Sequence, residues 1–284
     1  MGVRAAGGST RSALRFVVLS HSISLTVLLL LLARLREPLQ LESLRWGAPG
    51  LWAVAGGVVG GLGLTAFYIA LSRGAMGAAA AVSGLLAAAI PAVVSSALEG
   101  APRALTLAGF GMAAVAIWMI AAGDSPENTD SSGSTLALAA LGGVGFGFYF
   151  VALKFAGALG LVAPMALARA GSLAVCLLLL GAMAVWGRTR EKQIPSGNDN
   201  QKRSSRGRST ILPWALGVAL LDTGGNMLFV AATRLGRLDV AAVLASLYPA
   251  GTILLAAWQL HERPTRRQFA GMLAALAAVA MITL

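Results

Sequence analysis

Long apolar runs separated by short polar segments dominate the chain. Each run holds about 20 residues with few or no charges, the length that an α-helix needs to cross a bilayer. The pattern predicts nine transmembrane helices, at 13–34, 49–72, 75–98, 104–122, 134–157, 161–186, 211–235, 238–260 and 267–284. Because the runs are continuously apolar rather than alternating, they indicate an all-α integral membrane protein and argue against a β-barrel.

The composition agrees with membrane insertion. Hydrophobic residues make up 57% of the chain and charged residues 12%, whereas a soluble domain carries about a quarter charged residues. The net charge of +11 does not indicate a nucleic-acid partner, because the basic residues lie between the apolar runs, as they do in loops that flank membrane spans. One cysteine, Cys176, excludes a disulfide framework, and no motif predicts a metal or a cofactor.

Small residues recur at four-residue spacing inside the predicted helices. Gly57 and Gly61 lie in "GGVVGGLG", and Gly143 and Gly147 lie in "GGVGFGF". Small residues at this spacing let helix backbones approach closely in a bilayer. We therefore expect close helix packing at these positions.

Two parts of the chain are similar to each other. "FYIALSRG" resembles "LFVAATRLG", "LEGAPRALTLAG" resembles "HERPTRRQFAG", and the match pairs Arg15 with Arg169. The repeat predicts a first half at 1–122 and a second half at 134–284, joined by a linker at 123–133. A basic loop at 187–210 lies inside the second half.

The two halves differ by one helix. The second half holds five predicted spans and the first holds four, because no counterpart of 134–157 precedes the first half's other helices. A start codon placed too far downstream and a truncated family member both account for this. Five spans per repeat insert the two halves in opposite orientations. Inverted repeats of this kind are typical of transporters with a site near the membrane midplane.

The repeated segments resemble the drug/metabolite transporter superfamily, and in particular its ten-helix EamA-type members. The most specific segments are "LDTGGNMLFVAATRLGRLDVAAVLASLYPAGTILLAAWQLHERPTRRQFAG" and "GLTAFYIALSRG". The resemblance implies a carrier with inverted five-helix repeats in a bacterial inner membrane, which exports amino acids or other small solutes and is not an enzyme. The chain departs from the family in lacking the first helix and in having "LEGAPRA" where the family's usual form resembles "GERP".

Asp222 and Asn226 are the first candidates for the transport site. They lie one helical turn apart on one face of a predicted span, where a carboxylate costs about 2.5–3.5 kcal/mol or more. Such a carboxylate binds protons or a substrate amine, or it only packs helices through a hydrogen bond to Asn226. In the first case, Asp222→Asn abolishes gradient-driven flux and leaves folding intact.

Other polar residues within the spans are also candidates for the substrate or proton pathway. They are Tyr68, Ser83, Tyr149, Tyr248, Ser246, His21 and Arg169. Pro91 and Pro249 are candidate helix breaks, since proline removes a backbone donor; an ordinary kink is the alternative. Lys154 and Arg169 are expected to snorkel to the interface, with contact to an anionic substrate group as the alternative. Glu99 and Glu262 are expected to end helices at the interface.

These observations favour a secondary-active, alternating-access carrier that exports a small metabolite, amino acid or drug-like solute and is coupled to protons. The alternatives are an intramembrane enzyme for a lipid-linked substrate and a non-transporting assembly subunit. A homodimer is compatible with the sequence but is not predicted. Lys and Arg counts place the 187–210 loop in the cytoplasm, whereas the family resemblance places it outside; a reporter fused after Leu284 distinguishes the two.

Overall fold

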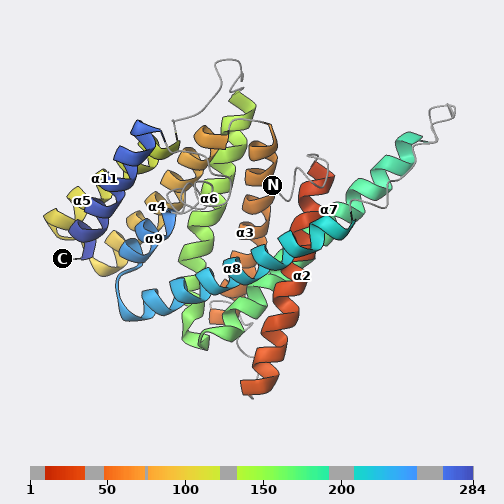
Figure 1. The fold of residues 1–284 in the computed structure, drawn as a ribbon. Coiled ribbons are helices and arrows are strands. Elements are labelled where there is room, and N and C mark those ends of the chain that lie inside the picture. The colour runs from red at the N-terminus through yellow and green to blue at the C-terminus, as the bar shows by residue number, and fades with distance from the viewer. Residues whose placement is uncertain are drawn as a thin grey trace.

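The protein is all-helical in the computed structural model, as predicted (Figure 1). The structure describes residues 10–35, 48–73, 76–121, 133–191, 208–247 and 265–283. Within these residues lie nine α-helices and the 3₁₀ helix η2. In chain order they are α2 (Thr10–Leu35), α3 (Pro49–Ser72), α4 (Met76–Glu99), α5 (Ala104–Ala121), α6 (Gly133–Ala156), η2 (Gly157–Leu159), α7 (Val162–Glu191), α8 (Arg208–Leu235), α9 (Leu238–Ser246) and α11 (Arg266–Thr283).

Six helices in the described part of the chain are long and apolar enough to cross a membrane. They are α2, α3, α4, α6, α7 and α8, and each overlaps a predicted span. The chain is therefore a multi-pass membrane protein. Of the other three predicted spans, one coincides with α5, a shorter apolar helix, and one with α11. The span predicted at 238–260 begins with α9, and its remainder after residue 247 lies outside the described residues. At these three positions the membrane crossing stays a prediction.

The helices pack into one bundle around α3 and α6, which lie side by side (Figure 1). On one side of this pair, α4 packs against α6 and α9, and α5 pairs with α11 at the edge. On the other side, α7 packs against α3 and α2, and α2 also contacts α8.

The main apolar core lies where α6, α7, α8 and α9 meet. Its large side chains that are at most 1% exposed are Leu153, Met165, Val230 and Leu238, together with Leu28 of α2. Phe150 of α6 stacks on Phe229 of α8 with ring centroids 4.4 Å apart. This core holds together the four helices that supply most of the polar groups described below.

Glycines set the shortest distances between helices. A Cβ atom at Gly57 of α3 would overlap the backbone of Ala168 on α7. A Cβ atom at Gly143 of α6 would lie only 2.7 Å from the Ser83 backbone on α4. The predicted close packing is therefore found at both positions. The other two glycines of the predicted pairs are equally crowded: Gly61 and Gly147.

We expect Gly57→Ala to lower the free energy of unfolding by about 1–3 kcal/mol or more, the usual cost of forcing an extra carbon into a packed core. The matched control is Gly111→Ala on α5, because Gly111 is exposed and no atom of the described residues lies within 4 Å of its added Cβ. Both changes carry the same gain in helix propensity. Thermal unfolding in detergent measures the difference, and equal midpoints for the two variants would contradict this packing account.

Candidate transport site

A cavity of about 260 Å³ lies at the centre of the bundle. Its walls come from α2, α3, α4, α6, α7, α8 and α9. The residues that line it are His21, Gly57, Gly60, Gly61, Leu64, Phe67, Tyr68, Ala87, Phe146, Tyr149, Phe150, Arg169, Ser172, Asp222, Asn226, Ala245 and Ser246. The lining combines an apolar, largely aromatic wall with one group of charged and polar side chains.

An ion pair between α7 and α8 forms the polar centre of the cavity. Arg169 Nη2 donates to Asp222 Oδ2 at 2.5 Å. The Arg169 side chain is 5% exposed and that of Asp222 is 38% exposed, so the guanidinium is enclosed and the carboxylate borders open space. An isolated charge in the middle of a membrane costs at least about 2.5–3.5 kcal/mol. Each member of the pair offsets the cost of the other.

Side chains of α2 hold the guanidinium from its other side. Arg169 Nε donates to Ser24 Oγ at 3.1 Å, and Arg169 Nη1 lies 3.4 Å from His21 Nε2. His21 Nδ1 lies 2.7 Å from Ser172 Oγ. Because arginine has no acceptor, His21 Nε2 must accept, which leaves Nδ1–H as the donor to Ser172. The contacts therefore fit a neutral His21 that fixes the direction of the guanidinium.

The carboxylate is held from within its own helix. Asn226 Nδ2 donates to Asp222 Oδ1 at 2.9 Å and to the Asp222 carbonyl at 2.8 Å. The neighbouring Thr223 hydroxyl is hydrogen-bonded to Ser24 Oγ of α2. Asp222 and Asn226 thus share one helical face, as expected from their spacing, and the network joins α8 to α2 and α7.

Aromatic rings form the apolar part of the cavity. The five rings belong to Phe67, Tyr68, Phe146, Tyr149 and Phe150. Phe67 and Phe146 meet edge to face with centroids 5.7 Å apart. The buried Tyr149 hydroxyl lies near Arg169 but makes no hydrogen bond of normal geometry within the described residues. The cavity thus offers an aromatic wall, a tyrosine hydroxyl and a charged pair.

Pro91 lies inside α4, which continues as one helix from Met76 to Glu99. The predicted break is therefore absent at Pro91. Proline nevertheless has no backbone N–H, so the carbonyl four residues earlier, at Ala87, loses its helical donor. Ala87 lines the cavity. Pro91 thus leaves an acceptor without its usual partner at the cavity wall while the helix remains intact.

The structure brings seven of the predicted pathway residues to the cavity: Asp222, Asn226, Tyr68, Tyr149, His21, Arg169 and Ser246. Ser83 is buried against Gly143 and does not line it. Tyr248 and Pro249 lie outside the described residues, as does Glu262. A part in transport stays a prediction for each of these residues.

The expectation that Arg169 snorkels to the interface is wrong. Arg169 follows the start of α7 by seven residues, and its side chain turns inward to Asp222. A nearby anion in the bundle offsets the desolvation of the guanidinium, so the inward position is favoured. Lys154, in contrast, lies in the last turn of α6 and remains partly exposed.

Sequence analysis missed three hydroxyl residues of this network: Ser24, Ser172 and Thr223. A signal for two of them was present. Ser24 follows His21 by three residues, and Ser172 follows Arg169 by three, which places each pair on one helical face. Thr223 adjoins Asp222 in sequence, but its partner on α2 is set only by the tertiary packing.

Breaking the ion pair should cost different amounts from its two ends. Asp222→Asn leaves an enclosed guanidinium without its anion and should lower the free energy of unfolding by about 3–5 kcal/mol. Arg169→Met leaves a carboxylate that borders open space and should cost less. The double variant should be more stable than Asp222→Asn alone. Unfolding midpoints in detergent test this order, and simple additivity of the two losses would contradict it. The expectation that Asp222→Asn leaves folding intact is revised accordingly.

Comparisons with known proteins agree with this architecture. Residues 133–284 match the EamA-like transporter family, whose members are generally transporters rather than enzymes. A solved structure, described only as the crystal structure of a protein, is similar in fold, with a TM-score of 0.68 at 16% sequence identity. The similarity covers 99% of this chain and 90% of the other. No curated protein matches the sequence at a significant level. Since the family match spans more than half of the chain, the protein belongs to the EamA-like transporter family of the drug/metabolite transporter superfamily.

Proposed function

We propose that the protein is an alternating-access carrier, and that its cargo is a small amphipathic solute with an acidic group. The observation that carries the proposal is the Arg169–Asp222 pair, which faces a cavity of about 260 Å³ at the centre of a membrane bundle. Intramembrane ionisable residues that face a cavity generally mark a solute or ion path. Family membership supports transport of a small solute in general terms.

The helix arrangement supports two inverted halves. The sequence repeat pairs α2 with α7, α3 with α8, α4 with α9 and α5 with α11. A twofold axis in the membrane plane would bring the helices that lie near it against their counterparts, and α3 with α8 is not among the main helix contacts. The contacts α2 with α7, α4 with α9, and α5 with α11 are all present. The cavity then lies where the halves meet, which is the usual place for a transporter's binding site.

The chemistry of the cavity favours one kind of solute. Arg169 presents donors suited to a carboxylate or another planar anion. Aromatic rings such as Phe67 and Phe146 cover the adjacent wall and suit an apolar body. An acidic group on the solute would replace the Asp222 carboxylate at the guanidinium. The volume limits the cargo to a small metabolite or amino acid.

In this proposal, Asp222 determines whether solute transport is coupled to protons. Once a solute anion holds Arg169, the Asp222 carboxylate has no cation beside it, and an unpaired charge is costly inside a membrane protein. A solute with an ammonium group supplies its own cation to Asp222 instead. We therefore infer that a monoanion moves together with a proton, whereas a zwitterion moves without one. As the family resemblance implies, the physiological direction in this proposal is export from a bacterial cell across its inner membrane.

Flux in proteoliposomes tests the proposal. The probes are three molecules of similar size: an apolar amino acid, an aromatic monocarboxylate and a quaternary ammonium ion. We expect saturable flux of the first two and none of the third. Arg169→Lys, which keeps the charge but loses the planar fork, should lower this flux at least about tenfold, equivalent to about 1.4 kcal/mol of binding. Ser96→Ala, at an exposed position on α4, is the matched control.

An imposed pH gradient tests the coupling separately. It should drive the monocarboxylate in the wild-type protein and leave the zwitterion flux unchanged. Asp222→Glu retains a carboxylate and should retain the coupling, while Asp222→Asn should lose it. Flux equal to that of empty liposomes for every probe would contradict the carrier function. Equal acceleration of zwitterion and monoanion would contradict only the role given to Asp222.

A further inference from the structure

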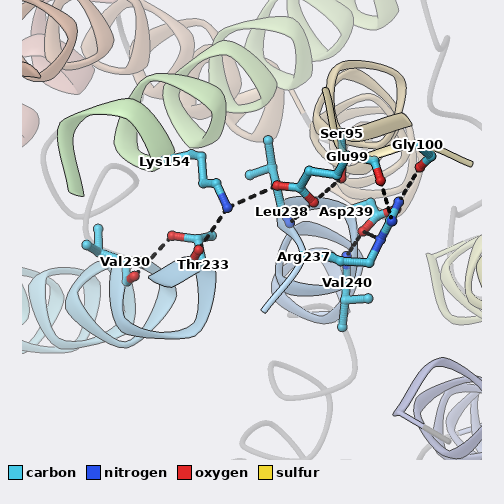
Figure 2. Close-up of polar contacts among 10 residues, drawn as sticks. All are labelled: Ser95, Glu99, Gly100, Lys154, Val230, Thr233, Arg237, Leu238, Asp239 and Val240. Atoms are coloured by element: carbon cyan, nitrogen blue, oxygen red, sulfur yellow. Dashed lines mark hydrogen bonds and ion pairs between the residues drawn. The ribbon is translucent and has the colours of Figure 1, made fainter. Parts of the chain in front are cut away.

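A second charged cluster lies at the C-terminal end of α4, away from the cavity (Figure 2). It joins the ends of α4, α6 and α8 and the start of α9. These helices also line the cavity. Asp239 precedes the cavity residue Ser246 by seven residues, and Thr233 follows Asn226 by seven. At the helical rise per residue, the cluster lies about 10 Å from the cavity along both helices.

Among the described residues of this cluster, the first half of the chain offers only acceptors to the second half. Glu99 presents its carboxylate, which also accepts a hydrogen bond from Ser95 Oγ at 2.9 Å. The backbone carbonyls of Glu99 and Gly100 point to the same place (Figure 2). Gly100 has a φ of 82°, a conformation that ends α4 and is readily adopted by glycine. The end of α4 is therefore a compact negative knob.

The second half of the chain contributes two cations, and each has its own anchor within that half. Lys154 Nζ donates to the Thr233 carbonyl of α8 at 2.9 Å. Arg237 Nη2 lies 2.8 Å from Asp239 Oδ2, and Arg237 Nε donates to both carboxylate oxygens. This carboxylate raises the pKa of Arg237 by hydrogen bonding. The Asp239 side chain is 0% exposed, and Arg237 is the cation that stabilises this buried carboxylate.

Within this cluster, four polar contacts between described residues cross from one half to the other, and all of them end on the knob. Lys154 Nζ lies 3.0 Å from Glu99 Oε1, and the Leu238 amide donates to Glu99 Oε2 at 3.3 Å. Arg237 donates to the carbonyls of Glu99 at 3.3 Å and of Gly100 at 2.8 Å. Figure 2 shows these links around the end of α4.

This division of contacts suits reversible separation. If the end of α4 withdrew, Lys154 would keep the Thr233 carbonyl and Arg237 would keep Asp239. Opening a buried ion pair is costly because a buried charge loses its only partner. Here no buried charge would do so. Glu99 and Lys154 are both partly exposed, so water can solvate them when they part. The cavity pair differs, because the guanidinium of Arg169 is enclosed.

We propose that the α4 knob and the Lys154–Arg237 socket form a gate, which closes the cavity at this end and opens when the knob leaves the socket. The proposal rests on the alternating-access function proposed above. It gives these residues a role in access rather than in solute binding. In the present structure the gate is closed.

Cysteine labelling from each side of the membrane tests the gate without any solute. The only cysteine, Cys176, is buried and is replaced by serine. Ser246→Cys then reports on the cavity, and a membrane-impermeant maleimide is applied to one face of oriented vesicles at a time. We expect Glu99→Gln to raise the rate of labelling from the gate face about fivefold, the range that loss of a partly exposed ion pair allows. Labelling from the opposite face should fall or stay the same.

Lys154→Met is a second variant. It breaks the Glu99–Lys154 ion pair from the other half of the chain and leaves the Arg237–Asp239 pair in place. Arg73→Gln is the matched control, because Arg73 contacts Ser134 at the opposite end of the bundle. It should leave gate-face labelling unchanged. If Glu99→Gln does not fold, the result with Lys154→Met decides.

Two results would overturn the gate: unchanged gate-face labelling in a folded Lys154→Met protein, or an equal rise with Arg73→Gln. The outcome is separate from that of the carrier proposal. Raised labelling without flux of any probe supports the gate and contradicts the proposed solute, whereas normal flux with unchanged labelling overturns the gate alone.

Discussion

The requirement that a guanidinium inside a membrane protein have an anion beside it governs the centre of this structure. Lipid cannot solvate Arg169, and the side chain does not reach the interface. Asp222 therefore has to lie on the facing helix at 2.5 Å, and α2 has to supply His21 and Ser24 on the other side. These contacts fix α2, α7 and α8 around one point and leave a polar group at the wall of an otherwise apolar cavity.

In the proposed mechanism, the central charged cluster serves binding and the cluster at the end of α4 serves access. The central pair is held by an enclosed cation, so only a ligand that replaces the anion can part it at low cost. At the end of α4, the charged groups that meet across the halves, Glu99, Lys154 and Arg237, are partly exposed. Each of the two cations also has a partner within its own half. Both clusters lie on α6, α8 and α9 or on helices packed against them. In the proposed gate, a shift of α4 relative to these helices alters access without disturbing the charges of the Arg169–Asp222 pair.

Sequence patterns predicted the features that follow from the free energy of placing single residues in a membrane. Apolar runs of about 20 residues located six helices, and Asp222 with Asn226 stood out because polar residues are expensive in such a run. The partner of Asp222 could not be predicted, since Arg169 lies 53 residues away in sequence and meets it only through helix packing. Ser83 and Ser246 occupy similar places in the repeat, yet only Ser246 lines the cavity. Asp239 was overlooked because an acidic residue in the first turn of a helix is ordinary.

The most direct test of the central claim is an experimental structure with a transported solute bound. The account predicts that the acidic group of the solute lies within hydrogen-bonding distance of the Arg169 guanidinium and that its apolar part lies against the Phe67 and Phe146 rings. The Arg169–Asp222 contact, 2.5 Å in the present structure, should be lengthened or lost. A solute bound elsewhere in the bundle, with this contact intact, would contradict the account.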